Sequence, residues 1–292
     1  MPNETSSQTL KKLEEWAKKE THSSNFLNFY QSLLRVQAEV EGRVDVPEIW
    51  LIKKVVDNRM ARGIPLLKFN DLAINWPLIE ETFNRIAAVF TDYPDLFGPI
   101  PEVLIKKEYG QRLTKKTAKA WFDGKSSPAI IGGEDINRYL LDSLIQQTLR
   151  PFLIKYSRAL IELVNQGGWR RGYCPVCGGN PDIAFLEKEV GERWLMCSRC
   201  DSQWRFQRLE CPSCGNQDAK KMSFLSDDEG GYRLYVCDNC KTYLKAIDLR
   251  KAGNDVYLPL ERLLTFDMDR QGHEMGYQPG YTQIEGTDTT RF

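Results

Sequence analysis

Apolar residues in the first 167 positions recur at spacings of three and four, which predicts amphipathic helices rather than strands. One helix face carries Leu10, Leu13, Trp16 and Ala17, and the next carries Phe26, Phe29, Tyr30, Leu33, Leu34 and Gln37. Further helices are expected at Trp50 to Met60, Trp76 to Phe90, Val103 to Leu113, Asp135 to Gln147 and Arg150 to Gln166. Such aromatic-rich stripes indicate the core of a helical domain rather than a cofactor site.

The pattern changes after Gly167-Gly168. Short alternating runs, Glu192 to Met196 and Tyr232 to Val236, predict strands that each lead into a pair of cysteines. The expected fold class is therefore α+β, with an all-helical N-terminal domain and a C-terminal region of two tandem rubredoxin-like or zinc-ribbon-like four-cysteine units. The predicted domains are residues 1–168, then 169–209 for the first unit, then 210–292 for the second unit with a C-terminal segment.

All eight cysteines form pairs separated by two residues, and none lies in the first 173 positions. The pairs are Cys174/Cys177, Cys197/Cys200, Cys211/Cys214 and Cys237/Cys240. There are 19 residues between the first two pairs, which is within the spacing of zinc-ribbon sites, and 22 between the last two, which is slightly above it. Two such turns can supply four thiolates to one tetrahedral ion, so these eight cysteines are the expected metal ligands.

The cysteine region also repeats itself. Cys174 to Gly178 matches Cys211 to Gly215 at an offset of 37, and the second pairs match at an offset of 40. Each repeat reads as Cys-Pro-x-Cys-Gly, a hairpin and Cys-x-x-Cys, which favours one ion per repeat; an interleaved sharing of the eight thiolates is the alternative. Gly178 and Gly215 are expected to adopt the positive φ that closes such a turn.

Other uses of these cysteines are less consistent with the pattern. Disulfides are rare in reducing compartments, and the strand and helix context of a thioredoxin-like motif is missing. An iron–sulfur cluster also takes four cysteines, but two symmetrical Cys-x-x-Cys repeats suit a single ion better. The expected cofactors are thus two mononuclear ions per chain, iron or zinc, each held by four cysteines. Zinc would be structural, whereas iron would make the units rubredoxin-like and able to pass one electron.

Charge gives no general argument for a nucleic-acid or membrane-surface partner. The chain has 40 Lys and Arg against 40 Asp and Glu, and residues 169–292 have 17 against 19. A local basic patch is still conceivable at Arg170, Arg171, Arg193, Arg205 and Arg208. The N-terminus has no readable secretory signal, and charges interrupt the apolar stretch Phe152 to Val164, so a cytoplasmic protein without membrane insertion is expected.

No catalytic group is expected. Gly124-Lys125-Ser126 resembles the end of a phosphate loop, but the upstream glycine is replaced by Lys119 and no strand pattern precedes it. His22 and His273 are predicted to be ordinary surface residues, because cysteine already supplies every ligand position. The sequence therefore predicts a protein that is not an enzyme.

The whole pattern resembles the formate dehydrogenase accessory protein family, FdhE. The likeness runs along essentially the full chain and rests on Trp169-x-x-Gly172-x-Cys174-Pro175-Val176-Cys177-Gly178-x-x-Pro181, three further pairs, Trp204, Tyr243-Leu244-Lys245, and the segment from Asp269 to Gly276-Tyr277. The resemblance implies a cytoplasmic, chaperone-like maturation factor with rubredoxin-like iron. It also implies that the partner is the catalytic subunit of respiratory formate dehydrogenase, bound before its twin-arginine export.

Three aromatic residues just outside the cysteine pairs, Trp169, Trp204 and Tyr243, are candidates for a partner-binding surface, because aromatic residues are enriched at interfaces. Packing over the metal loops is the alternative for all three. Two other functions compete with the maturation factor. One is a nucleic-acid-binding zinc ribbon protein, and the other is a small iron electron-transfer protein.

Overall fold

A computed structural model describes residues 5–18, 25–47, 52–73, 75–105, 113–125, 130–131, 134–135, 137–253 and 255–281. These residues divide into two compact units. Residues 5–47 and 69–155 form the helical unit, and residues 52–68 and 156–281 form the cysteine unit. The division differs from the domains predicted above, because it places residues 52–68 and the end of the last long helix with the cysteines.

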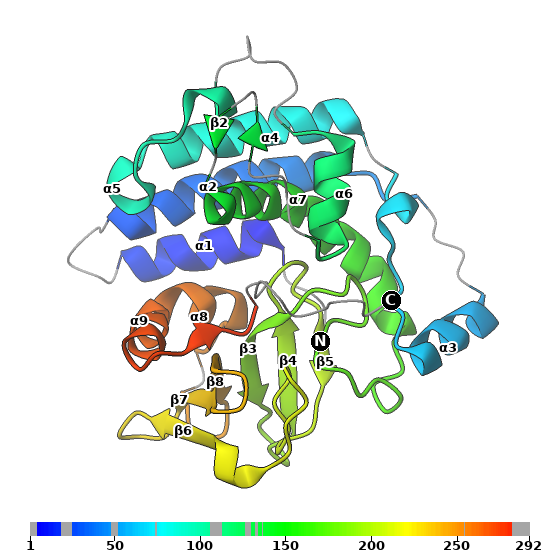
Figure 1. Ribbon diagram of the computed structural model, residues 1–292, viewed down its shortest axis with the longest axis vertical. Helices are drawn as coiled ribbons and strands as arrows, with labels where there is room; N and C mark the ends of the chain where they lie inside the picture. The colour runs from blue at the N-terminus through cyan, green and yellow to red at the C-terminus, as the bar shows by residue number, and fades with distance from the viewer. Residues whose placement is uncertain are drawn as a thin grey trace. The chain divides into compact units, whose positions relative to one another are not determined.

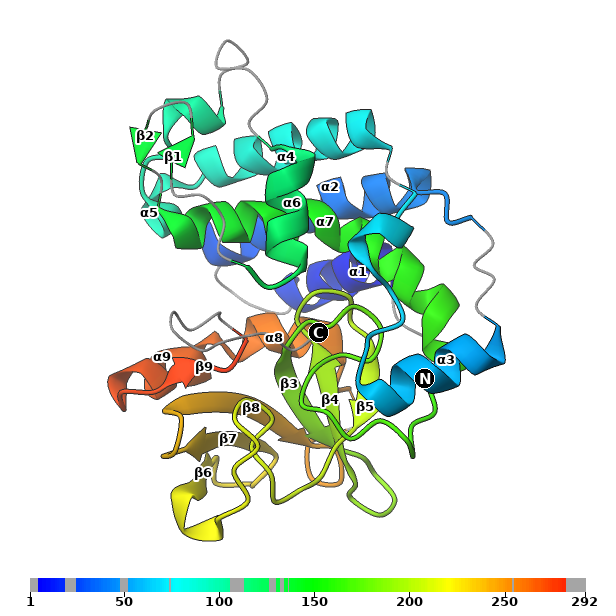
Figure 2. The same ribbon diagram turned by 45° about the vertical axis from the view of Figure 1, so that its right-hand side comes forward.

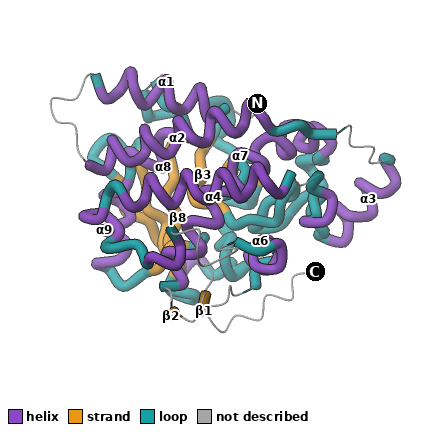
Figure 3. The backbone as a smooth tube through the Cα atoms, turned by 90° about the horizontal axis from the view of Figure 1, so that it is seen from above, coloured by secondary structure: helices purple, strands orange, loops and turns teal. Residues whose placement is uncertain are grey.

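The helical unit is built around long amphipathic helices. Its elements are α1 (Ser6–Ala17), α2 (Asn25–Arg43), the 3-10 turn η1 (Phe69–Asp71), α4 (Trp76–Thr91), α5 (Pro94–Phe97), η2 (Glu102–Leu104), α6 (Lys115–Phe122), the short antiparallel strands β1 (Ile130–Ile131) and β2 (Glu134–Asp135), and most of α7 (Arg138–Leu160). Figure 3 shows α1, α2 and α4 side by side. Thr5 caps α1 in a capping box with Gln8, and Asn75 caps α4. Buried Leu13, Leu33 and Phe83 belong to the core between these helices.

The helix predicted at Trp76 to Phe90 is confirmed as α4, and the described residues differ from the prediction at two other places. Within Val103 to Leu113 the described residues 103–105 form only the end of a 3-10 turn, and residues 106–112 lie outside the described part. The helices predicted at Asp135 to Gln147 and at Arg150 to Gln166 are one continuous helix, α7, with Pro151 inside it. Proline leaves the carbonyl four residues earlier without its helical partner. Here the side-chain amide of Gln37 donates to that carbonyl, on Gln147, at 3.0 Å.

The cysteine unit contains a seven-stranded sheet with the order β5-β4-β3-β8-β7-β6, and β9 pairs with β8. Its elements are α3 (Lys53–Arg62), the end of α7, η4 (Ile161–Leu163), β3 (Pro181–Leu186), β4 (Arg193–Cys197), β5 (Gln203–Arg205), η5 (Ala219–Lys221), β6 (Met222–Ser226), β7 (Tyr232–Cys237), β8 (Thr242–Asp248), α8 (Leu258–Leu264), α9 (Phe266–Glu274) and β9 (Gln278–Pro279). The predicted strands at 192–196 and 232–236 are confirmed as β4 and β7.

Each sequence repeat forms an antiparallel three-stranded ribbon, β3-β4-β5 or β6-β7-β8. The two ribbons are joined because β3 pairs in parallel with β8, with Ala184 opposite Ala246. Figures 1 and 2 show the two ribbons with α8 and α9 beside them. The expected fold class, a helical region followed by two tandem four-cysteine units, is therefore confirmed. The sequence did not predict that the two ribbons share one sheet.

Helix α8 packs on this sheet. Leu258 closes an apolar cluster with Ile183 and Phe185 of β3, Met196 of β4 and Ile247 of β8, and all five side chains are buried. Because the cluster draws on strands of both repeats, neither ribbon buries this face alone.

We predict that Gly172→Ala destabilises the cysteine unit. A Cβ at position 172 would lie 2.0 Å from the carbonyl oxygen of Pro212, which is a backbone atom of the third cysteine turn. The two backbones would have to separate, and overpacking of this kind costs about 1–3 kcal/mol. Urea denaturation measures the effect. The matched control is Gly253→Ala, where a Cβ meets nothing within 4 Å, and equal losses in the two variants would contradict the prediction.

Candidate metal centre

Each of the four cysteine pairs lies in a tight turn with the same backbone geometry. The N–H four residues after the first cysteine donates to that cysteine's carbonyl, at 3.0 Å for Gly178, 3.3 Å for Asp201, 2.8 Å for Gly215 and 2.8 Å for Lys241. All four of these residues have a positive φ, between 55° and 76°. The prediction for Gly178 and Gly215 is confirmed. Asp201 and Lys241 adopt the same conformation without being glycine, which the sequence did not indicate.

The sulfurs gather into two groups of four: Cys174, Cys177, Cys197 and Cys200, then Cys211, Cys214, Cys237 and Cys240. All sulfurs within a group lie within 4.8 Å of one another. The expected grouping, one repeat per site, is thus the one that the structure forms, and the interleaved alternative is not.

The sulfur spacing fits a tetrahedral ion. The shortest distances are 3.5 Å for Cys177 to Cys197 and 3.7 Å for Cys174 to Cys200, with 3.7 Å and 3.8 Å in the second group. With metal–sulfur bonds of about 2.3 Å, the corners of a tetrahedron lie about 3.8 Å apart. A disulfide needs about 2.05 Å, and all eight cysteines are free. Both groups can therefore hold a metal ion, although four thiolates do not distinguish iron from zinc.

Hydrogen-bond donors surround the sulfurs, as expected for groups that carry negative charge when they bind metal. The backbone N–H of Val176 lies 3.4 Å from the sulfur of Cys174, and that of Arg199 lies 3.4 Å from Cys197. Two hydroxyls that the sequence did not indicate also lie within hydrogen-bond distance of cysteine sulfurs. Ser202 Oγ lies 3.2 Å from the sulfur of Cys200, and Thr242 Oγ1 lies 3.0 Å from that of Cys240. The same offset of 40 relates the two hydroxyls, so the repeat could have revealed them.

Burial and hydrogen bonds shift the thiol pKa values in both groups. Burial raises the pKa of Cys174 well above its usual value, because desolvation disfavours the thiolate. In the second group a hydrogen bond from Cys240 and backbone N–H groups of Cys214 and Ser213 lower the pKa of Cys211 to about 5, although its burial acts in the opposite direction. In the same group, burial raises the pKa of Cys237 and a hydrogen bond with Cys211 raises that of Cys240. A divalent cation would favour the thiolate in both groups, and its binding would release protons.

Arg262 of α8 ties the helix to the first group, which the sequence analysis did not anticipate. Its guanidinium lies 2.6 Å from Asp201, 2.9 Å from Asp182 and 3.3 Å from the carbonyl oxygen of Cys197. Burial alone would lower the pKa of Arg262, but the two carboxylates outweigh it and the pKa is raised. The signal in the sequence was the adjacent pair Glu261 and Arg262 within an otherwise apolar run, and this signal alone did not identify the partners of Arg262.

Glu261 precedes Arg262 and is also buried, with a hydrogen bond of 3.1 Å from the Tyr232 hydroxyl. Burial raises its pKa, so the folded chain keeps the proton at pH values where the unfolded chain has lost it. Stability contributed by this group is therefore lost as the pH rises through the folded pKa. We expect Glu261→Gln to raise the melting temperature relative to the parent chain at pH 8, and to do so less at pH 4.5. An equal gain at both pH values would contradict this.

The three aromatic residues proposed for partner binding are buried, which corrects that expectation. Trp169 is 1 % exposed, Trp204 0 % and Tyr243 3 %. Their polar atoms are also used internally, since Trp169 Nε1 donates to the Tyr173 carbonyl, Trp204 Nε1 to that of Arg171, and the Tyr243 hydroxyl to Asp269. The structure supports the alternative, that these side chains pack around the cysteine turns.

Two of the five arginines considered for a basic patch are engaged within the protein. Arg193 is buried and donates to the backbone carbonyls of Gln207 and Glu210, while Arg205 pairs with Glu192. His273 packs against the Tyr243 ring and belongs to neither cysteine group, and His22 lies outside the described residues.

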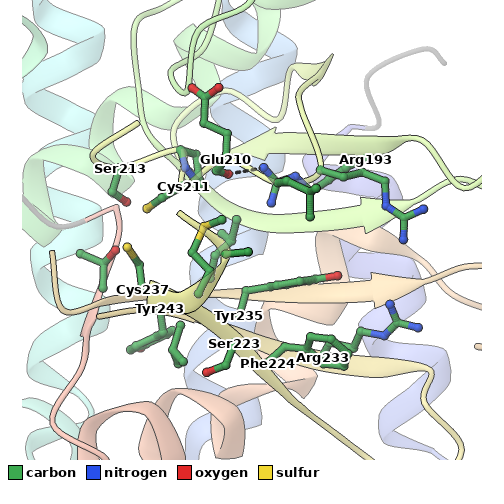
Figure 4. A pocket seen from close by; sticks show the side chains of 18 residues that line it. Arg193, Glu210, Cys211, Ser213, Ser223, Phe224, Arg233, Tyr235, Cys237 and Tyr243 are labelled. Carbon is green, nitrogen blue, oxygen red and sulfur yellow. Dashed lines mark hydrogen bonds between the residues drawn. The ribbon is translucent and has the colours of Figure 1, made fainter. Parts of the chain in front are cut away.

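A hollow of about 350 Å³ lies beside the second group (Figure 4). Figure 4 shows Cys211 and Cys237 together near Ser213 and Tyr243, with Arg233 at the opposite end. The exposed side chains of Leu209 and Phe224 contribute to its apolar walls.

The fold and the two groups define a class of protein in which a helical unit is joined to a double ribbon with two four-cysteine centres. Within this class, residues 173–208 match the family model for the central domain of FdhE. That segment contains the whole first cysteine group.

Comparison with individual proteins also finds similarity to FdhE. An FdhE homologue of Aquifex aeolicus is 27 % identical over 259 residues, which cover 87 % of this chain and 86 % of that one. FdhE of Escherichia coli O127:H6 is 30 % identical over 112 residues, covering 38 % and 36 %. The crystal structure of FdhE from Pseudomonas aeruginosa shares the fold, with a TM-score of 0.61 and 18 % identity over 97 % of this chain and 96 % of that one. These findings confirm the predicted resemblance to the FdhE family.

In the described part of the chain, no helix combines the length and apolar character needed to cross a membrane.

Proposed function

We propose that this protein is a cytoplasmic, non-catalytic accessory factor for the formation of active respiratory formate dehydrogenase. In this role it binds the catalytic subunit before twin-arginine export. The observation that carries the proposal is the combination of FdhE relatives along the chain with two complete four-cysteine groups.

The eight cysteines are proposed to bind two mononuclear ions per chain. A bound zinc ion would hold its ribbon in shape, and a bound iron ion would in addition accept and donate one electron. Elemental analysis with a visible spectrum, on protein purified without oxygen, distinguishes these cases. About two metals per chain are expected from eight thiolates.

The nucleic-acid alternative has less support. Of the five arginines considered for a basic patch, Arg193 is buried and Arg205 is paired with Glu192. Phosphate contacts need accessible cationic groups, and binding through them weakens strongly with salt. Filter binding at two salt concentrations tests this alternative.

The accessory role is tested in a host whose own FdhE gene is deleted and whose formate dehydrogenase is therefore inactive. Supplying this chain should restore formate oxidation. The tagged chain should also co-purify with the catalytic subunit when twin-arginine export is blocked. Failure of the chain to restore formate oxidation in the deletion host would overturn the proposed role. Restored oxidation with no association of the two proteins would overturn its binding step.

A further inference from the structure

The two cysteine groups differ in their access to solvent. All four cysteines of the first group are buried. In the second group Cys214 is exposed and Cys240 is half-buried, whereas Cys211 and Cys237 are buried. Equivalent positions of a sequence repeat therefore have different surroundings.

Several segments distant in sequence cover the first group. The loop after α3 runs along its first turn, with the N–H of Leu66 donating to the Pro175 carbonyl at 2.9 Å and that of Leu67 to the Val176 carbonyl at 2.8 Å. From the end of α7, the Ser157 hydroxyl donates to the Cys200 carbonyl at 2.9 Å. Arg262 of α8 binds the Cys197 carbonyl from a third direction. Opening this group requires the displacement of packed structure.

The corresponding turn of the second group has open surroundings. Gly215, next to Cys214, is exposed, and a Cβ built on it meets nothing within 4 Å. The Cys214 sulfur accepts a long, weak hydrogen bond, at 3.5 Å, from the Nδ2 atom of the exposed Asn239. The hollow of Figure 4 reaches Cys211 and Cys237 as well.

We propose that the second cysteine group is the exchange site of this protein, with Cys214 as the ligand that opens, and that the first group holds its ion permanently. The proposal rests on the proposed binding of two ions. The incoming group is a soft thiolate donor. With an ion bound, Cys214 would give up its bond to it, the incoming thiolate would bind in its place, and the freed Cys214 thiolate would take a proton from water and leave hydroxide. No electron changes hands.

The test uses the full chain loaded with two equivalents of Co²⁺, whose thiolate charge-transfer bands report each four-cysteine site. On addition of excess glutathione as the thiolate donor, with a chelator to trap released metal, we expect two phases of equal amplitude. Their rates should differ by about tenfold or more, because the slow phase needs local opening of packed structure. Cys214→Ser should abolish the fast phase and leave the slow one, and the matched variant Cys177→Ser should abolish the slow phase and leave the fast one.

Because Cys177→Ser can unfold the unit, alkylation of the loaded wild-type chain with iodoacetamide gives a second measurement. Cys214 and Cys240 should be modified before any cysteine of the first group. A single phase for both ions, or earlier modification of the first group, would overturn the exchange site while leaving the proposed metal binding intact. A chain that binds no metal would overturn the proposed function and this inference together.

Discussion

Cys197→Ser is expected to remove one metal per chain and to unfold the first ribbon, β3-β4-β5. Cys197 ends β4, it is fully buried, and its carbonyl receives Arg262. Apparent binding free energies of structural zinc sites are about 10–16 kcal/mol, which is comparable to or larger than a whole domain's stability of about 5–15 kcal/mol. Elemental analysis should give about one metal instead of two, and amide exchange in β3, β4 and β5 should lose its protection.

The matched control is Cys214→Ser in the exposed turn of the second group. This variant should also lose metal from its own site, but the strands of the first ribbon should keep their protection from exchange. Equal loss of amide-exchange protection in the two variants would contradict the prediction that the first group contributes more to the stability of the sheet.

Arg262→Met is expected to destabilise the cysteine unit by about 3–5 kcal/mol, because it leaves Asp182 and Asp201 buried without their cation. Methionine has a similar length and keeps the apolar packing of the side-chain stem. The two carboxylates are 12 % and 4 % exposed, so water can screen them only slightly. Urea denaturation of the metal-loaded chain measures the loss.

Two further variants make this prediction specific. Arg270→Gln breaks the exposed pair with Asp267 and should change stability by less than about 0.5 kcal/mol. Adding Asp182→Asn and Asp201→Asn to Arg262→Met should recover part of the loss, since the buried charges are then gone. A triple variant less stable than Arg262→Met would show that the cost does not come from uncompensated charge.

The cysteine groups could be predicted from the sequence because each turn is a local structure. Two cysteines separated by two residues fix the position of both sulfurs, and the repeat of the pattern favours the pairs that combine. Helix α4 was predictable for a similar reason, since its cap at Asn75 and its apolar stripe lie within one segment.

The remaining features depend on contacts between distant residues. The spacing of apolar residues says nothing about Gln37, whose amide satisfies the carbonyl that Pro151 leaves free. The sequence alone does not show whether Trp169 and Trp204 lie on the surface or in the core, because their contacts come from distant residues. Both are buried. Arg262 looks like an interruption of an apolar run, and its role becomes visible only with Asp182 and Asp201 beside it.

The parallel pairing of β3 with β8 has a consequence for synthesis of the chain on the ribosome. β3 leaves the ribosome early, but its outer edge is completed only when β8 has emerged at the end of the second repeat. Until then the nascent first ribbon presents an unpaired strand edge, which is a site for association with other chains. We therefore expect chaperones that bind nascent chains to protect this edge until β8, which ends at Asp248, has left the ribosome.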